Sequence, residues 1–69
     1  MSFEEYQKLG TEQDWKCAIC KEYRDRLCVD HNHLTGKIRG LLCKDCNQGI
    51  GFLRDNIKLL ENSIKYLER

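Results

Sequence analysis

The segment that decides the fold of this chain runs from Cys17 to Asn47. It begins with the pair Cys17-Ala18-Ile19-Cys20, continues through Val29-Asp30-His31-Asn32-His33-Leu34-Thr35-Gly36, and closes with Cys43-Lys44-Asp45-Cys46-Asn47. Cys-x-x-Cys turns supply thiolates in the tetrahedral arrangement that zinc prefers. Because four cysteine ligands leave no open position on the metal, we expect a structural zinc site formed by Cys17, Cys20, Cys43 and Cys46.

Other uses of the cysteines are less favoured by the pattern. The chain holds five cysteines, and an odd number without a secretory signal favours metal binding over disulfides. A redox dithiol role for the two pairs is the main alternative to zinc. Cys28 has no partner at the same spacing, and we interpret it as a small apolar side chain in a strand. A ligand role for Cys28 beside His31 and His33 stays open.

Length and composition indicate one small domain, residues 1–69, that needs a stabilising cross-link such as a bound metal. With 69 residues, 41% of them apolar and 33% charged, the chain buries a modest core, and domains of this size usually depend on a metal or on disulfides. No apolar stretch approaches the roughly 20 residues of a membrane span, so no membrane partner is expected. The acidic N-terminus lacks the apolar core of a secretory signal, which predicts a cytoplasmic protein.

Charge is unevenly distributed along the chain. Residues 16–44 carry seven basic and three acidic side chains, a balance of +4, whereas residues 1–15 sum to −3 and residues 45–69 to zero. A basic middle segment could face a polyanion such as nucleic acid. An ordinary solvated surface explains the same pattern equally well, so charge alone does not decide between them.

Local patterns predict an N-terminal helix followed by a hairpin. Ser2 and Glu5 fit a capping box that starts a helix over residues 2–14, with Gly10 weakening its middle and Trp15 packing against the zinc lobe. Cysteine knuckles at 17–20 and 43–46 flank a hairpin over residues 27–42. Its strands, 27–34 and 37–42, meet at a tight turn containing Gly36, and the inward residues are expected to be Val29, Ile38 and Leu41.

The remaining sequence is predicted to form helices over residues 44–54 and 55–68. Gly49 and Gly51 weaken the first of them, and Asp55 is a plausible N-cap for the second. Four apolar residues recur on one face of the second helix: Ile57, Leu60, Ile64 and Leu67. We interpret this stripe as core rather than a partner-binding surface, since a chain this short has few other core residues.

Asp30, His31 and Asn47 form the candidate reactive group. Hydrolysis of a phosphodiester needs a divalent cation on the phosphate and a base for the attacking water. Carboxylate and amide oxygens suit Mg²⁺ or Mn²⁺, and a neutral imidazole suits proton removal near pH 7. Neighbouring strand residues point to opposite faces, so Asp30 and His31 serve one site only if the strand ends or bends there.

At this point the motifs resemble those of the recombination endonuclease VII family, a branch of the HNH, or ββα-metal, nucleases. The resemblance extends from about Tyr6 to Leu67. It is carried by Cys17-Ala18-Ile19-Cys20, by the segment from Val29 to Gly36, and by Arg39-Gly40-Leu41-Leu42-Cys43-x-x-Cys46-Asn47. It implies a small α+β protein, a zinc-stapled ββα-metal (His-Me finger) fold with an added helix at each end.

The resemblance also implies a role for each site residue. Asp30 and Asn47 would hold the catalytic cation, Mg²⁺ or Mn²⁺, and His31 would be the general base. His33 would lie beside the phosphate, and phosphate charge would be neutralised by Arg39 and Lys37. Asn32 stands where the family often has Asp, which gives a literal His-Asn-His, and we assign it a supporting role.

Chain length shapes the expected activity. Members that resolve DNA junctions carry further helices that build an intertwined dimer, whereas this sequence ends at Arg69. We therefore expect a phage-encoded or prokaryotic DNA endonuclease, a monomer or weak dimer, that nicks one strand per active site with little sequence specificity. It would act alone or within a larger phage or restriction assembly. The alternative is a non-catalytic, zinc-stabilised nucleic-acid-binding module.

Overall fold

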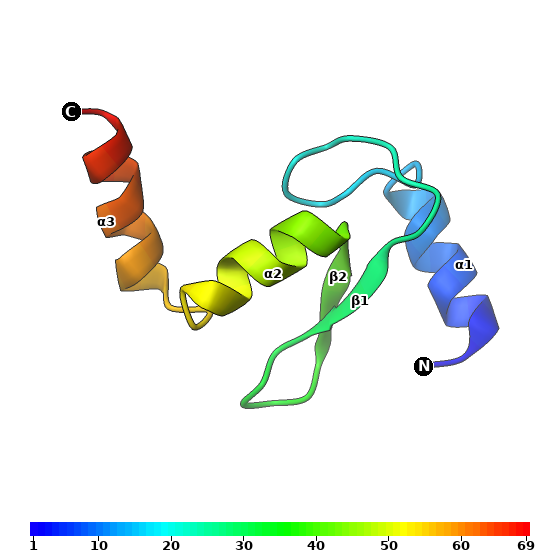
Figure 1. Ribbon diagram of the computed structural model, residues 1–69. Coiled ribbons are helices and arrows are strands. Elements are labelled where there is room, and N and C mark those ends of the chain that lie inside the picture. The colour runs from blue at the N-terminus through cyan, green and yellow to red at the C-terminus, as the bar shows by residue number, and fades with distance from the viewer.

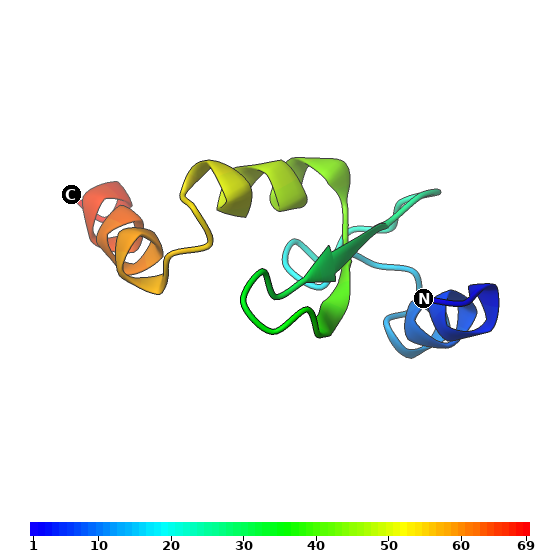
Figure 2. The ribbon, with the colours of Figure 1, turned by 90° about the horizontal axis from the view of Figure 1, so that it is seen from below.

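A computed structural model describes residues 1–69 as three helices and one two-stranded antiparallel sheet. In chain order the elements are α1 (Phe3–Glu12), β1 (Cys28–His31), β2 (Ile38–Leu42), α2 (Lys44–Phe52) and α3 (Ile57–Leu67). The molecule is elongated, 42 × 27 × 16 Å. The sheet and α2 occupy its middle, while α1 and α3 lie at opposite ends (Figures 1 and 2). The α+β class is therefore confirmed.

Helix α1 starts at the predicted capping box and ends earlier than predicted. The Ser2 hydroxyl accepts a hydrogen bond from the Glu5 backbone at 3.1 Å and donates to its carboxylate at 3.3 Å. At the other end, Trp15 N–H donates to the Gly10 carbonyl at 2.8 Å, and Asp14 N–H donates to the Thr11 carbonyl at 3.1 Å. These two bonds form a Schellman motif, which stops the helix at Glu12 instead of residue 14.

Gly10 is where the Trp15 ring meets α1. Gly10 is buried, and a Cβ built on it would overlap the Trp15 indole. Tyr6 completes the contact, its ring 5.6 Å from that of Trp15, and its hydroxyl donates to the Leu27 carbonyl at 2.8 Å. Trp15 packs against the buried cluster that contains the cysteines, as predicted. Gly10 thus serves a close contact that the sequence analysis did not anticipate.

The hairpin has shorter strands than predicted and a bulge at the end of β1. The register pairs Asp30 with Gly40 but His31 with Ile38, which leaves Arg39 as the extra residue on β2. Residues 32–37 form the connecting loop, so the prediction of a strand reaching Leu34 was wrong. The loop closes on Asn32, whose side-chain oxygen accepts from the backbone of Leu34 and Thr35 at 2.9 and 3.1 Å.

The core is very small. Only eight residues are buried, and its five apolar members are Cys17, Leu27, Leu41, Leu42 and Cys43. Leu41 is fully buried, as predicted, whereas Val29 and Ile38 are only half-buried. Two of the five core residues are cysteines of the Cys-x-x-Cys pairs, so the core and the paired cysteines occupy the same part of the molecule.

Gln13, the C-cap of α1, connects this helix to the edge of β2 through two hydrogen bonds. Its side-chain amide accepts a hydrogen bond from Leu41 N–H at 3.0 Å and donates to the Leu41 carbonyl at 3.0 Å. The amide therefore satisfies the same backbone groups that a third strand would satisfy. A Cβ on Gly40 would lie 3.3 Å from the Gln13 oxygen, so the glycine keeps this edge open.

The C-terminal helices differ from prediction in their boundaries and in their burial. Helix α2 ends at Phe52, and α3 is capped by Asn56, whose side chain accepts from Leu59 N–H at 3.0 Å. Asp55 is therefore not the N-cap. The apolar stripe of α3 is mostly exposed, at 72% for Ile57, 59% for Ile64 and 79% for Leu67. The expectation that it forms core was wrong, because α3 extends away from the sheet (Figure 1).

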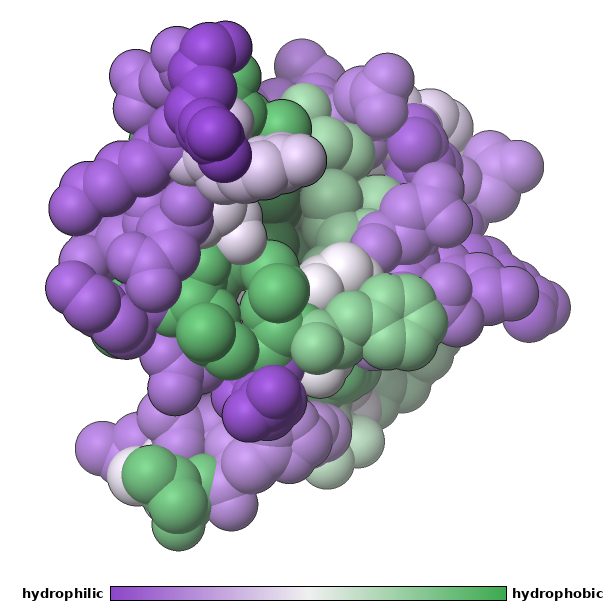
Figure 3. All heavy atoms as spheres, turned by 60° about the vertical axis from the view of Figure 1, so that its left-hand side comes forward, coloured by the Kyte–Doolittle hydropathy of each residue, from purple (hydrophilic) through white to green (hydrophobic).

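Apolar side chains are visible on the face towards α3. Figure 3 shows them gathered between hydrophilic side chains. The exposed apolar residues of this half of the chain include Phe52, Ile57, Ile64, Tyr66 and Leu67. None of the helices has both the length and the apolar character needed to cross a membrane.

Candidate functional site

The two Cys-x-x-Cys pairs converge on one point. The sulfurs of Cys17, Cys20, Cys43 and Cys46 all lie within 4.8 Å of one another, with the Cys20 and Cys43 sulfurs 3.9 Å apart. Sulfurs around a tetrahedral zinc with Zn–S bonds of about 2.3 Å are separated by about 3.8 Å. The donor set and its spacing therefore fit a closed metal site, as the sequence predicted.

Backbone hydrogen bonds prepare two of the sulfurs for a metal. Ile19 N–H donates to the Cys17 sulfur, and Cys46 N–H donates to the Cys43 sulfur, each at 3.4 Å. Burial acts to raise the pKa of Cys17, but backbone hydrogen bonds, first that of Cys43, outweigh it and lower the pKa from 9.0 to about 6. Thiolates are the form that binds metal.

The thiols of Cys20 and Cys46 hold their protons more tightly than an ordinary cysteine does. Burial, helped by the neighbouring Cys43 thiol, raises the pKa of Cys46 to about 12. The backbone at Glu22 acts to lower the pKa of Cys20, but burial and the adjacent thiols outweigh it and raise that pKa. A metal must therefore displace protons from this cluster, which makes its binding dependent on pH.

The cysteine cluster fixes the start of α2 beside the sheet. Cys43 is the N-cap of α2, immediately after β2, and Ala18 N–H donates to the Leu41 carbonyl at 3.1 Å. Helix α2 packs against β1. Asn47, one residue after Cys46, lies in the first turns of α2 and is half-buried. Its backbone N–H donates to the Cys43 carbonyl at 3.0 Å, while its side-chain amide has no hydrogen-bond partner within the chain.

Asp30 is the one buried charged residue, at 8% exposure. Arg39 donates to both of its carboxylate oxygens, from Nε at 2.7 Å and from Nη2 at 3.0 Å. The hydrogen bond to Asp30, opposed by desolvation, raises the pKa of Arg39 above its usual value. The bulge makes this contact possible because Arg39 is the inserted residue of β2. Arg39 thus neutralises the one carboxylate that the fold buries.

The bulge also bears on the relationship between Asp30 and His31. The strand ends at His31, and its pairing shifts between these two residues. The sequence analysis called for an end or a bend of the strand here if both side chains are to serve one site; that they share one site stays a prediction. Asp30 is buried and His31 is exposed. An exposed imidazole without a hydrogen-bond partner in the chain is accessible to water.

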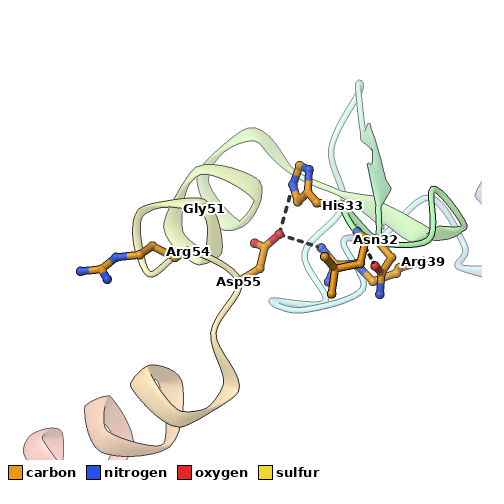
Figure 4. Close-up of a pocket in the computed structure, with 7 residues that line it drawn as sticks. Asn32, His33, Arg39, Gly51, Arg54 and Asp55 are labelled. Atoms are coloured by element: carbon orange, nitrogen blue, oxygen red, sulfur yellow. Dashed lines mark hydrogen bonds and ion pairs between the residues drawn. The ribbon is translucent and has the colours of Figure 1, made fainter.

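A groove of about 440 Å³ lies next to the Asp30–Arg39 pair. It runs between the hairpin loop and the turn after α2 (Figure 4). Asp55 lies between the two sides: its Oδ2 is 3.1 Å from His33 Nε2 and 3.3 Å from Arg39 Nη2. The lining residues are Asn32, His33, Leu34, Arg39, Gly51, Arg54 and Asp55.

Asp55 is the groove residue that sequence reasoning missed. Its position at the start of the last predicted helix indicated an N-cap, and no local pattern links it to Arg39, which is 16 residues earlier. Of the other predicted positions, Lys37 is exposed in the hairpin loop and Cys28 is half-buried in β1 opposite Leu42. Cys28 does not belong to the metal-binding cluster, in keeping with its interpretation as an ordinary strand residue.

Fold and site together define a small α+β domain built around four cysteines positioned to bind a metal, with a buried, arginine-paired aspartate at its sheet. The chain belongs to the recombination endonuclease VII family, whose model matches residues 1–69. It is 46% identical over 70 residues to the Gene 59 protein of Mycobacterium phage D29, covering 96% of this chain. It is 41% identical over 68 residues to the Gene 59 protein of Mycobacterium phage L5, covering 93% of this chain. The chain spans 42% of the length of each of these phage proteins.

Proposed function

We propose that this domain is an HNH-type DNA endonuclease that hydrolyses phosphodiester bonds with the help of a divalent cation. In this proposal β1, β2 and α2 are the ββα-metal unit, and the four cysteines hold a structural zinc. Membership in the endonuclease VII family supports nuclease chemistry. The order of strand, strand and helix, with cysteines bracketing it, supports the fold assignment.

The observation that carries the proposal is the position of Asp30. It is a buried carboxylate at the end of β1, on a sheet packed against the helix that bears Asn47. Burying a carboxylate costs free energy that its ion pair with Arg39 offsets. Its sequence neighbour His31 is exposed at the bulge, where a substrate can reach it.

The donor set suits a hard cation. Asp30 offers carboxylate oxygens that two hydrogen bonds from Arg39 hold in place, and Asn47 offers an amide oxygen that no other group in the chain engages. Carboxylate and amide oxygens are the ligands that Mg²⁺ and Mn²⁺ prefer. When bound, such a cation supplies Lewis-acid stabilisation of charge on the phosphate.

The remaining residues would handle protons and phosphate charge. His31 would take the proton from the attacking water, as a neutral imidazole does near pH 7. His33, 80% exposed on the groove rim, would contact the phosphate on the same face. Arg39 and the exposed Lys37 would neutralise phosphate oxygens, Arg39 from within the groove.

Substrate and context follow from the proposed class. One domain has one site, so each encounter cuts one strand, and we expect nicking with little sequence preference by a monomer or weak dimer. The phage relatives support a phage-encoded protein that acts in the cytoplasm of a bacterial host, alone or within a larger assembly. The chain spans only 42% of the length of the first phage relative. What the full-length protein does is therefore also part of this proposal.

A second candidate, a non-catalytic zinc-stabilised nucleic-acid-binding module, has one observation in its favour. Both oxygens of Asp30 are engaged by Arg39, so the aspartate already has a partner that accounts for its burial. Such a module would need the cysteines but would not need His31 or Asn47.

A supercoiled-plasmid assay separates the two candidates. With Mg²⁺ or Mn²⁺ the protein should yield nicked circles before linear DNA, and a chelator of divalent cations should stop cleavage. Alanine substitutions at the chain's two histidines form a matched pair. His31→Ala should abolish nicking, while His33→Ala should reduce it. Metal-dependent nicking that survives His31→Ala would remove His31 as the base. Binding without cleavage across several divalent metals would favour the module.

A further inference from the structure

Asp55 reaches the candidate site because of how α2 ends. Asp55 N–H donates to the Ile50 carbonyl at 2.8 Å, and Arg54 N–H donates to the Gly51 carbonyl at 2.9 Å, which is a Schellman motif. Arg54 and Asp55 both have left-handed backbones, with φ of 60° and 52°. This turn reverses the chain so that the Asp55 side chain points back towards the hairpin, while Arg54 points away (Figure 4).

Asp55 and Asp30 share one guanidinium. Arg39 Nη2 donates to Asp30 Oδ1 at 3.0 Å and to Asp55 Oδ2 at 3.3 Å. The Asp55 side chain is only 18% exposed, and the same oxygen lies 3.1 Å from His33 Nε2. A single carboxylate oxygen thus contacts two of the three side chains that the proposed function assigns to the phosphate, His33 and Arg39.

The negative charge of Asp55 needs an explanation, because it lies in the groove where a DNA phosphate would bind. The groove that would take a DNA phosphate is lined by Arg39 and Arg54 but also by Asp55. A carboxylate so close to a polyanion opposes binding through like-charge repulsion. If Asp55 did nothing else, its removal would only improve DNA binding.

We propose that Asp55 is a positioning residue of the nuclease site: it holds Arg39 beside Asp30 and orients His33, at the expense of some DNA affinity. This inference rests on the proposed function and adds the turn after α2 to the site. A guanidinium with two carboxylate partners keeps its place when its contact with Asp30 is loosened, because Asp55 still retains it. Partners that support a ligating carboxylate in this way typically contribute roughly 10- to 100-fold to activity.

The test uses Asp55→Asn with Asp14→Asn as its control. Asparagine has the shape of aspartate and tolerates a left-handed backbone, so the turn is preserved while the charge is lost. Asp14 has φ of 55°, nearly that of Asp55, in the corresponding motif at the end of α1. Its side chain is exposed and unpaired, so this control removes one charge from a residue of similar φ elsewhere in the chain.

In Asp55→Asn, turnover should fall without any loss of affinity for DNA. For Asp55→Asn we expect kcat for plasmid nicking to fall roughly 10- to 100-fold, while KM and the Kd for DNA without divalent cation stay unchanged or decrease. Asp14→Asn should match the wild type in both. In an Arg39→Ala background, Asp55→Asn should have much less further effect, because it acts through Arg39. A kcat within twofold of wild type, or a loss confined to KM, would overturn the inference.

A readout without cleavage keeps this inference separate from the proposed function. In a nitrogen–proton correlation spectrum of the zinc-loaded protein, the Arg39 Nε–H should be slow to exchange, and Asp55→Asn should speed that exchange while Asp14→Asn does not. An unchanged Arg39 signal would contradict the positioning role even if the protein cuts DNA. If the wild type never cuts DNA, the proposed function fails, whatever the Arg39 signal shows.

Discussion

Arg39 donates two hydrogen bonds to the Asp30 carboxylate, from Nε at 2.7 Å and from Nη2 at 3.0 Å. The planar guanidinium matches the carboxylate edge, which gives a geometry that a lysine cannot reproduce. This contact depends on the bulge that inserts Arg39 opposite the end of β1. One backbone irregularity therefore sets the direction in which the buried carboxylate presents its oxygens.

Replacing Arg39 by lysine tests whether this geometry matters beyond charge. Arg39→Lys keeps the positive charge but loses the paired donors, so Asp30 should become mobile. We expect nicking to fall roughly 10- to 100-fold, with zinc content and helical circular dichroism unchanged. Arg26→Lys, at an exposed residue without an ion pair, is the matched control and should behave as wild type. Equal activity of the two variants would show that charge alone suffices.

Gly10 and Gly49 should respond oppositely to alanine. At Gly10 a new Cβ meets the Trp15 indole, so Gly10→Ala should destabilise the protein by about 1–3 kcal/mol. At Gly49, inside α2, a new Cβ meets nothing within 4 Å, so Gly49→Ala should stabilise it by about 0.5–1 kcal/mol. Chemical denaturation of the zinc-loaded variants measures both. A neutral or stabilising Gly10→Ala would refute the packing of Trp15 on this residue.

Zinc affinity should fall as the pH falls, and the protein should unfold as the metal leaves. Zinc must displace the protons of Cys20 and Cys46, whose pKa values are raised, in the case of Cys46 to about 12. Cys17, with its pKa lowered to about 6, is largely thiolate at neutral pH, and that advantage is lost as the pH falls through about 6. Each proton displaced changes the affinity by about tenfold per pH unit.

The plot of log Kd for zinc against pH should therefore become steeper below about pH 6, where Cys17 also takes up a proton. Competition with a chelator of known affinity measures it, and circular dichroism follows the unfolding. Cys28→Ser is the control, because Cys28 lies outside the cluster; it should leave the curve unchanged. An affinity independent of pH would contradict binding through these thiols.

Local chemistry accounts for what the sequence predicted well. The cysteine spacing predicted the cluster of four cysteines, and the Ser2–Glu5 capping box predicted the start of α1, because each pattern acts over a few residues. The interruption between the last two helices was also placed correctly, near Arg54 and Asp55. In each case a short pattern and one physical constraint were sufficient.

Features that depend on distant contacts could not be predicted in this way. Asp55 looked like a cap, and only the folded chain shows that it meets Arg39. The stripe of α3 has the period of a core helix, yet burial depends on a neighbour that this fold does not provide. Likewise the alternation of apolar and polar residues along the two strands does not reveal the bulge that makes Arg39 an extra residue of β2. The roles of Asp30, His31, His33 and Asn47 in catalysis stay predictions.

The nicking rate of Asp30→Asn tests the central claim most directly. Asparagine keeps the size of the buried side chain but removes the charge that would hold a divalent cation, and Asp25→Asn, at an exposed position in the preceding loop, is the matched control. On supercoiled plasmid with Mg²⁺ or Mn²⁺, we predict a loss of roughly 100-fold or more for Asp30→Asn, with zinc content and DNA binding retained and Asp25→Asn unaffected. Metal-dependent nicking by Asp30→Asn within a few-fold of the wild-type rate would contradict the account.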